Sequence, residues 1–326
     1  MSSHFRGGLI SALEAPAETL RLLALCRDAL AAEGNLWADF FAARIRKRIE
    51  EGSFQGRLWS GPGDEAVALA GWVVAGDLGR RGWAYLAPGF QTRVVLEGFL
   101  QRLEAPGEGS LPFISWADEV PGVPEPDRHT VFAGRGFSSV VRADMRYPRD
   151  EVLSRPRPDP DHSPRRLGLA DEPFIADLLY RTYANSPERA LFATTRDQRE
   201  DARRGTHGLL HGDVGRWLPE ASYGIEENGR LIAQTLANDL EGGLITEVGV
   251  DPAYRRRGLA RRLLPLTIEA LRSAGFGVPR LVVTMWNPGA VRLYESLGFE
   301  FVPGGAGRVW LNLPALGVTA PSSPPG

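Results

Sequence analysis

The sequence predicts an α/β protein of two domains, each with a mixed, mostly antiparallel sheet flanked by helices. Three observations support this prediction. The chain has 326 residues, more than one compact core commonly holds, so about two domains are expected. A stretch rich in proline and charge, residues 148–164, divides the chain near its middle. After it, the predicted elements follow the order β–α–loop–β–β–β–α–β–α–β, which is typical of a sheet covered by helices.

The composition indicates a soluble protein without a disulfide framework. Hydrophobic residues make up 43% and charged residues 24% of the chain, and the net charge of −2 gives no electrostatic reason to expect a nucleic-acid or membrane partner. The single cysteine, Cys26, lies on the apolar stripe of a predicted helix and is assigned to a core. Residues 1–10 lack the apolar stretch of a signal peptide, and no apolar run could span a bilayer. We therefore expect a cytoplasmic protein.

Two segments are expected to lack regular structure. In residues 148–164, prolines restrict their neighbours to extended conformations and no apolar period is present, so this segment is predicted to be a linker. Residues 314–326 are expected to form a disordered tail. The chain is therefore divided into a first domain at residues 1–147 and a second domain at residues 165–313.

Local signals define the elements of the second domain. Asp171 and Pro173 predict a helix start, as N-cap and first-turn residue. Asn228-Gly229 is the strongest hairpin signal in the chain. The predicted strands are 165–169, 222–226, 231–238, 243–250, 281–285 and the segment from Phe299 onward. Predicted helices begin near Asp171, Gly258 and Ala290, and the polar segment 193–217 is expected to be helix and loop.

The segment Val248–Leu264, VGVDPAYRRRGLARRLL, has the clearest chemical meaning. A strand ends at Val250, and a basic loop leads into a helix that begins at Gly258. The N-terminus of a helix binds anions, because its first N–H groups have no intrahelical partner and carry partial positive charge. Gly258 and Ala260 leave room for a phosphate to approach the backbone. Further positive charge comes from Arg255, Arg256, Arg257, Arg261 and Arg262.

Residues 255–260, Arg-Arg-Arg-Gly-Leu-Ala, resemble the pyrophosphate-binding signature of the GNAT N-acetyltransferase family, Gln/Arg-x-x-Gly-x-Gly/Ala. Val250-Asp251-Pro252 resembles the Val-x-Pro that precedes it. The resemblance implies that acetyl-coenzyme A (acetyl-CoA) is the co-substrate, that backbone N–H groups of this loop hold its pyrophosphate, and that its pantetheine arm lies where the strand splays from the next one. The cofactor-binding residues expected on this basis are Val248, Val250, Arg255, Arg256, Arg257, Gly258, Leu259, Ala260 and Asn287.

A second segment, Asn287–Phe299, resembles another signature of the family, Asn-x-x-Ala-x-x-x-Tyr-x-x-x-Gly-Phe. By that resemblance, Asn287 contacts the coenzyme arm and Tyr294 donates a proton to the departing thiolate. A phenol can serve in this role because a thiolate forms as the tetrahedral intermediate collapses. The two motifs occur in order, each in the strand–helix context that it requires, and the resemblance covers nearly half of the chain.

The acceptor amine must be neutral when it attacks, so a carboxylate or a water chain must take its proton. Glu247 is the best candidate, because strand alternation points it away from Val248 and Val250, and many GNAT enzymes have an acidic residue near this position. A solvated or salt-bridged glutamate is an equally good interpretation. Glu226 and Asp239 are weaker candidates. By the family pattern, a backbone N–H near Val250 binds the thioester carbonyl.

A pair of histidines, His207 and His211, has the four-residue spacing of helix-borne zinc ligands. Gly205 and Gly208 weaken a helix there, and no third ligand is evident, so we expect no metal site. A place in the acceptor pocket stays open for the two histidines. The basic segment could also be a solvated or nucleic-acid-binding face, but its position before Gly258 favours coenzyme phosphates.

Three other features have a structural interpretation. Tyr183 and Trp217 fall in segments that shape the acceptor site in this family, but core packing is favoured for both. Pro265 lies about two turns into the helix that begins near Gly258, and it should kink that helix beyond the phosphate contacts. The chain has neither a P-loop lysine motif nor Gly-x-Gly-x-x-Gly, which removes support for phosphoryl transfer and dinucleotide redox chemistry.

The first domain repeats the plan of the second without its chemical residues. Gly136-Phe137 parallels Gly298-Phe299, but Phe132 takes the place of Tyr294, and the segment after Phe90 has no Gly-x-Gly/Ala loop. Predicted helices are 20–30, 36–49 and 93–103, and predicted strands are 55–59, 66–74, 83–90 and 111–116. We expect a tandem protein with a degenerate, non-catalytic GNAT-like domain at 1–147.

The sequence therefore favours an N-acetyltransferase that transfers an acetyl group from acetyl-CoA to a small-molecule or N-terminal amine by direct attack. A covalent route is disfavoured because Cys26 lies in the other domain. One alternative is a non-catalytic protein that binds or senses acyl-CoA. A further one is an acyltransferase with a longer acyl donor. The identity of the acceptor and the oligomeric state are left open.

Overall fold

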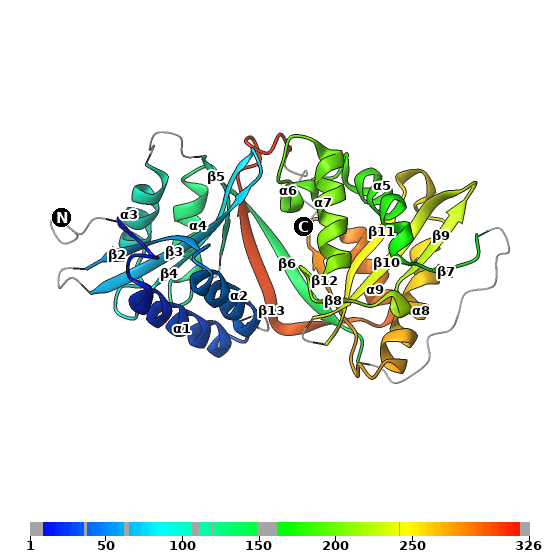
Figure 1. The fold of residues 1–326 in the computed structure, drawn as a ribbon, viewed down its shortest axis with the longest axis horizontal. Helices are drawn as coiled ribbons and strands as arrows, with labels where there is room; N and C mark the ends of the chain where they lie inside the picture. The colour runs from blue at the N-terminus through cyan, green and yellow to red at the C-terminus, as the bar shows by residue number, and fades with distance from the viewer. Residues whose placement is uncertain are drawn as a thin grey trace. The chain divides into compact units, whose positions relative to one another are not determined.

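The computed structural model describes residues 9–35, 38–61, 65–105, 111–118, 120–148, 162–240 and 242–319. These residues form two compact units: unit 1 holds 9–141 and 304–319, and unit 2 holds 142–303. Each unit has a mixed sheet with helices packed on it (Figure 1). The predicted fold class is therefore confirmed. No helix in the described parts of the chain is long and apolar enough to cross a membrane.

Unit 1 has four helices among its described residues: α1 (Pro16–Ala32), α2 (Ala38–Glu50), α3 (Arg93–Glu104) and α4 (Glu125–Ala133). Its strands are β1 (Leu9–Ser11), β2 (Gln55–Ser60), β3 (Ala66–Ala75), β4 (Gly79–Leu86), β5 (Phe113–Ala117) and parts of β6 (Ser138–Arg146) and β13 (Glu300–Leu311). The sheet order is β1-β2-β3-β4-β5-β13. β4 and β5 run parallel, and the other neighbouring pairs are antiparallel.

Two hydrophobic clusters fill unit 1, one on each face of its sheet. Cys26 and Leu22 of α1 pack with Leu58 on one face, so the core assignment of Cys26 is confirmed. The neighbouring Trp59 packs with Phe99 of α3 on the other face. This change of face between Leu58 and Trp59 follows from the two-residue period of a strand.

Unit 2 has the helices α5 (Glu172–Tyr183), α6 (Arg189–Phe192), α7 (Gln198–His211), α8 (Leu259–Ser273) and α9 (Pro288–Leu297), with short 3₁₀ turns at Leu169–Asp171, Pro219–Ala221 and Pro252–Tyr254. Its strands are β7 (Arg165–Arg166), β8 (Arg216–Trp217), β9 (Tyr223–Glu227), β10 (Arg230–Asp239), β11 (Gly243–Val250), β12 (Arg280–Thr284) and parts of β6 and β13. The order is β6-β12-β11-β10-β9-β7, with β8 beside β10. Only β11 and β12 pair in parallel among these neighbours.

The predicted hairpin joins β9 to β10 through Asn228 and Gly229. Both residues have positive φ, 51° and 73°, as a type I′ turn requires. α5 and α7 pack on one face of the sheet, where Ile175, Leu210 and Leu236 share a cluster. α8 and α9 pack on the other face, in clusters that also hold β10, β11 and β12 side chains.

The limits of the two units differ from the domain limits that composition predicted, which were residues 1–147 and 165–313. Arg142–Arg146, the second half of β6, pairs antiparallel with β12 and belongs to unit 2. The chain returns to unit 1 at Gly304, and Val309–Leu311 pair with β5. Both unit limits fall inside a strand, and a strand shows no break in composition. The content of proline and charged residues therefore could not predict where the chain passes from one unit to the other.

The two segments that were expected to be irregular are described only in part. Residues 314–319 form a turn in which Leu316 is only 2% exposed, so the predicted disorder is wrong there; the apolar side chain of Leu316 is buried in unit 1. Residues 320–326 lie outside the described residues, as do 149–161 of the expected linker. At the end of that linker, the Nε2 atom of His162 lies 3.0 Å from a carboxylate oxygen of Glu227.

Candidate functional site

A gap opens between β11 and β12 in unit 2. The strands pair in parallel only at Leu244–Arg280 and Ile245–Leu281, whereas β11 continues to Val250 and β12 to Thr284. The edge of β11 beyond Ile245 therefore presents backbone groups that no strand of this pair satisfies, and such groups are available to a ligand. The splayed strand that the family resemblance implied is present.

A β-bulge explains where the strands part. β11 pairs with β10 along its length, but the register shifts so that Leu236 faces Glu247 and Ala237 faces Ile245, which leaves Thr246 as the extra residue. Bulges bend a strand and increase its local twist. The Thr246 hydroxyl is 2.7 Å from Asn238 Oδ1 and holds the bulge in place. Thr246 carries no sequence signal for a bulge, so this feature was not predicted.

The predicted phosphate-binding loop lies at the end of β11. Gly258 is the N-cap of α8 with a left-handed φ of 79°, and Arg256 also has a positive φ, 66°. A Cβ added at Gly258 would meet nothing within 4 Å, so the backbone is open on that side. The N–H groups of Leu259 and Ala260 belong to the first turn, where a helix provides no acceptors. The loop therefore has the conformation of an anion site.

The three arginines of the loop have different environments. The Arg255 guanidinium donates to the backbone carbonyl of Thr182 over 3.0 Å, which ties the loop to the end of α5. Arg257 lies over the Tyr254 ring, 4.7 Å from its centroid. Arg256 is exposed. Arg255 and Arg257 thus hold the loop in shape, and all three add positive charge to it.

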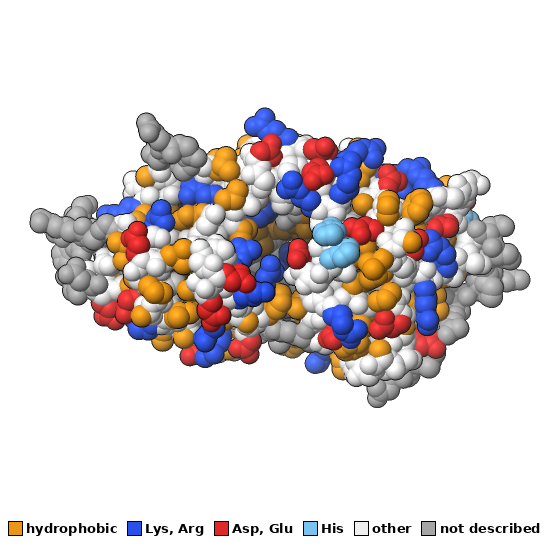
Figure 2. All heavy atoms as spheres, viewed as in Figure 1, with side chains coloured by type: hydrophobic (Ala, Val, Ile, Leu, Met, Phe, Trp, Pro, Cys, Tyr) orange, Lys and Arg blue, Asp and Glu red, His pale blue; other side chains and the backbone are white. Residues whose placement is uncertain are grey.

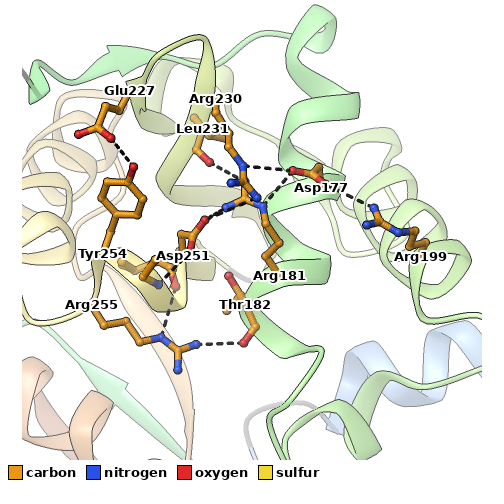
Figure 3. A network of polar contacts seen from close by, with 12 residues as sticks. Asp177, Arg181, Thr182, Arg199, Glu227, Arg230, Leu231, Asp251, Tyr254 and Arg255 are labelled. Carbon is orange, nitrogen blue, oxygen red and sulfur yellow. Dashed lines mark hydrogen bonds and ion pairs between the residues drawn. The ribbon is translucent and has the colours of Figure 1, made fainter.

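A buried ion-pair network fixes the start of this loop (Figure 3). Arg181 of α5, whose side chain is 11% exposed, forms ion pairs with Asp251 and Asp177 and donates to the carbonyl of Leu231 over 2.7 Å. Asp251 also accepts from the backbone N–H of Ala253 at 3.0 Å. The network joins α5, β10 and the end of β11. The sequence placed Asp251 only within the Val-x-Pro resemblance, and nothing local in the sequence identified Arg181 as its partner.

Glu247 points from β11 towards α5. Its side chain is buried, and the Tyr183 hydroxyl lies 3.2 and 3.3 Å from its two carboxylate oxygens. Burial raises the pKa of Glu247 to about 8, although the hydrogen bond from Tyr183 opposes the shift. Val248 and Val250 pack instead with the clusters of α8 and α9, so the predicted alternation along β11 is confirmed.

Tyr294 of α9 is close enough to Glu247 and Glu188 to interact with them electrostatically. It is 7% exposed, and its ring centroid is 5.8 Å from that of Phe299. Burial raises the pKa of Tyr294, and the carboxylates of Glu247 and Glu188 raise it further. The phenol is therefore held protonated, as a proton donor must be.

Asn287 links Glu188 to the N-terminus of α9. Its Oδ1 accepts from the backbone N–H of Ala290 at 3.0 Å and caps α9, and its Nδ2 donates to Glu188 Oε2 at 3.0 Å. Burial raises the pKa of Glu188, against the hydrogen bonds from Asn287 and Thr284. Glu188 precedes the one-turn helix α6 and was not predicted, because it belongs to no motif.

Arg142 of β6 was also not predicted. Burial lowers the pKa of its guanidinium, which lies 5.9 Å from the centroid of the Phe192 ring. Its Nε is buried without a hydrogen-bond partner among the described residues. The nearby carboxylates of Asp144 and Glu188 oppose this shift of the pKa. Arg142 reaches unit 2 from the first half of the sequence, so motif spacing in the second half could not locate it.

Two further buried polar groups surround Glu247. The Thr182 hydroxyl and the side-chain amide of Gln234 have no hydrogen-bond partner among the described residues. A Cβ built at Gly249 would lie 3.4 Å from Thr182 Oγ1 and from a Glu247 oxygen, so these groups are neighbours. Buried polar atoms of this kind are places for ordered water, which is how a proton can leave a buried carboxylate.

The weaker candidates have other contacts. Glu226 accepts from Arg165 at 3.1 Å. Asp239 forms an ion pair of 3.2 Å with Arg216. Trp217 packs in the core of unit 2, as favoured from the sequence, and donates to Ser222 Oγ at 3.0 Å.

Residues 181–299 match the sequence model of the Acetyltransferase (GNAT) family. The chain is 35% identical over 80 residues to the [ribosomal protein bS18]-alanine N-acetyltransferase of Escherichia coli K12, covering 24% of this chain and 54% of the relative. It is 34% identical over 135 residues to the mycothiol acetyltransferase of Thermobispora bispora, covering 40% of this chain and 43% of that protein. The chain thus spans about half the length of each.

Several solved structures resemble this chain over most of its length. The GCN5-related N-acetyltransferase from Sphaerobacter thermophilus has a TM-score of 0.62 and 18% sequence identity, covering 93% of this chain and 94% of that one. At this identity the likeness shows the fold, and it extends over both units. The match of residues 181–299 contains Glu247, Gly258 and Tyr294, whereas Arg142 lies outside it.

Proposed function

We propose that unit 2 transfers an acetyl group from acetyl-CoA to a primary amine, on a small molecule or at a polypeptide N-terminus. One observation carries the proposal: the gap beside β11, the open helix N-terminus at Gly258, and the buried groups Glu247 and Tyr294 all lie around the second half of one strand. The match of residues 181–299 to the GNAT family also supports acetyl transfer as the proposed activity.

The coenzyme is placed by the backbone in this proposal. The pyrophosphate binds the N–H groups of Gly258, Leu259 and Ala260, with charge from the loop arginines. The pantetheine arm follows the free edge of β11 beside Val248 and Val250, where an extended amide chain can pair with a strand that lacks a neighbour. A backbone N–H near Val250 binds the thioester oxygen and stabilises the negative charge that develops there.

Glu247 and Tyr294 move the protons. The amine nitrogen attacks the thioester carbon, and its proton passes to the Glu247 carboxylate directly or through water beside Thr182. The C–S bond then breaks, and Tyr294 donates its phenolic proton to the thiolate. A base whose pKa is about 8 is well matched to an amine near neutral pH.

The acceptor is proposed to enter beside Glu188, Arg142 and Phe192, because Glu188 interacts electrostatically with Glu247 and the Phe192 ring centroid lies 5.4 Å from that of Tyr183, the hydrogen-bond partner of Glu247. The name of one relative places its acceptor on an alanine of ribosomal protein bS18. The other relative is named for mycothiol. A primary amine fits a site with the buried carboxylate of Glu247 and the half-buried carboxylate of Glu188.

Unit 1 is proposed to be a degenerate GNAT-like domain that does not catalyse transfer. Its described residues have a similar order of strands and helices around one parallel strand pair, although unit 2 has one more helix and the short strand β8 before its hairpin. It lacks a carboxylate on β4 and has Phe132 where unit 2 has Tyr294.

The alternative is a protein that binds acyl-CoA without turnover. The test is incubation of the full chain with acetyl-CoA and a panel of small amines and N-terminal peptides, with detection of the free coenzyme thiol and calorimetry of coenzyme binding. Amine-dependent thiol release supports the transferase. Tight binding without release for any amine supports the sensing protein, and absence of binding would reject both. Competition between acetyl-CoA and longer acyl donors tests the chain length.

A further inference from the structure

Three side chains on the surface of unit 2 form what we call the acid–histidine cluster: Glu172, His207 and His211. The two oxygens of Glu172 each contact one ring, at 3.0 Å to His207 Nδ1 and 3.1 Å to His211 Nε2. The imidazole rings are stacked with centroids 4.1 Å apart. Figure 2 shows histidine side chains gathered in one exposed patch, over the position of α7 in Figure 1.

The structure overturns both reasons for dismissing a metal here. α7 runs from Gln198 to His211 without interruption, so the two histidines share one face of a real helix. Its glycines adjoin other side chains: a Cβ at Gly205 would lie 3.6 Å from Leu179 of α5, and one at Gly208 would lie 2.9 Å from Asp213. Close packing thus outweighs the low helix propensity of glycine. The third ligand is Glu172, the first residue of α5, which is distant in sequence from the two histidines.

We propose that the acid–histidine cluster binds a divalent transition-metal ion of borderline softness, of which Zn²⁺ is the representative. Glu172, His207 and His211 each offer one ligand atom, and these atoms all lie within 4.8 Å of one another. Two imidazoles and one carboxylate are a set that zinc accepts at about 2.0–2.2 Å, with solvent in the remaining position. Hard ions such as Mg²⁺ prefer oxygen ligands and are excluded by the two nitrogens.

The side chains are available for this role. His207 and His211 are 65% and 42% exposed, so an ion can reach them without opening the fold. One ring nitrogen of each histidine forms a hydrogen bond with one oxygen of Glu172. Metal binding replaces these hydrogen bonds, and small rotations of the three side chains turn their lone pairs to one centre.

A bound ion would clamp the first turn of α5 to the last turn of α7. At its other end, α5 carries the residues that contact the proposed acetyl-transfer site: Arg181, Thr182 and Tyr183. The ion therefore stabilises the placement of α5 and takes no part in the acyl transfer. Its binding can be measured whether or not the proposed function holds.

The experiment is a Zn²⁺ titration of the chelator-treated full chain, by calorimetry and by thermal unfolding. We expect one ion per chain and a rise in Tm at saturating Zn²⁺, because a ligand that binds only the folded state stabilises it. His207→Ala, His211→Ala and Glu172→Gln should each weaken binding by about tenfold or more, the effect of losing roughly 1.4 kcal/mol. Mg²⁺ should give no response.

His129→Ala is the matched control, because it removes an exposed histidine from α4 in unit 1. Its Zn²⁺ affinity should equal that of the parent. The proposal is overturned if the parent binds no Zn²⁺, if His207→Ala together with His211→Ala leaves binding unchanged, or if His129→Ala weakens it equally. Should an alanine variant misfold, Glu172→Gln and a Co²⁺ absorption titration of the parent give the same decision.

Discussion

Units 1 and 2 each contain a strand that runs parallel to the next strand for a few residues and then leads into a helix. In unit 1 this strand is β4, paired with β5 from Arg80 to Gly82 and followed by α3. In unit 2 it is β11, paired with β12 at Leu244 and Ile245 and followed by α8. The topology is shared, so the differences between the units lie in the side chains that this topology presents.

The first difference is at the start of the helix. Thr92 caps α3 with its own side chain, whose oxygen accepts from the Val95 N–H at 3.3 Å. Gly258 begins α8 with no side chain at all, so the N–H groups of the first turn stay available to an external anion. A helix N-terminus thus becomes a ligand site only when the protein does not satisfy it internally.

The second difference is in titratable groups. β4 has the sequence GRRGWAYL and contains no carboxylate, whereas β11 carries Glu247. Phe132 is fully buried and stacks on Trp310, with centroids 5.3 Å apart, where Tyr294 of unit 2 offers a phenol. Unit 1 therefore has packing side chains at the positions where the proposed mechanism places the proton-transfer groups of unit 2.

The largest expected effect comes from filling the open helix N-terminus. Gly258→Glu places a charged side chain and a strained left-handed backbone at the phosphate loop, so we expect loss of measurable coenzyme binding by calorimetry. Gly89→Glu in unit 1 is the matched control, because Gly89 has a similar φ of 86° and also nothing within 4 Å. Both variants carry the same backbone cost of about 1–2 kcal/mol. Equal coenzyme affinity in the two variants would contradict the loop assignment.

Removing the base should slow turnover and change its pH dependence. Because the pKa of Glu247 is raised to about 8, the carboxylate form becomes more abundant as pH rises, and kcat/KM should increase up to about pH 8 and then level. Glu247→Gln should lower kcat on the order of 10²–10³-fold and abolish this rise. A pH profile with the same midpoint in the variant would exclude Glu247 as the base.

The raised pKa of Glu247 also determines how the free energy of unfolding changes with pH. The pKa of Glu247 in the folded chain lies above its ordinary value of 4.5, so the folded state holds the proton more tightly than the unfolded state. This contribution is fully present below pH 4.5 and is lost as pH rises through about 8. The stability of Glu247→Gln relative to the parent should therefore rise between about pH 4.5 and pH 8 and stay level above pH 8, measured by urea unfolding.

Loss of the proposed proton donor should be milder. Tyr294→Phe keeps the ring that packs against Phe299 and removes only the hydroxyl, so coenzyme affinity should be nearly unchanged while kcat falls about 10²-fold. Tyr85→Phe is the control in unit 1, where burial raises the pKa of Tyr85 to about 12 but no transfer is proposed. A drop in affinity that matches the drop in kcat would indicate a packing role instead.

Much of this comparison could be predicted from the sequence because its signals are local. The turn at Asn228-Gly229, the helix start at Gly258 and the strand at residues 243–250 each depend on neighbouring residues, and the structure has all three. The order of the Gly-Phe pairs also placed Phe132 at the position of Tyr294, and this equivalence stays a prediction.

What could not be predicted depends on residues distant in sequence. Arg181 meets Asp251 only when α5 lies against β10, and Glu188 meets Asn287 only through the same packing. The bulge at Thr246 results from the register of two strands, which no single strand specifies. The sequence therefore indicated the groups that are proposed to bind and react, and it missed the distant residues that contact them.

The smallest expected effect tests unit 1 at the position equivalent to Gly258. Thr92→Ala removes the N-cap of α3, and loss of such a cap costs about 1 kcal/mol. Amides in the first turn of α3 should exchange with solvent about fivefold faster, measured by hydrogen exchange with mass spectrometry, because 1 kcal/mol is roughly that factor. Coenzyme binding and kcat should stay at parental values, since the open amides at Gly258 are untouched. If Thr92→Ala instead created a second coenzyme site in calorimetry, the capping side chain would be what silences unit 1, and the loop sequence would matter less than its cap.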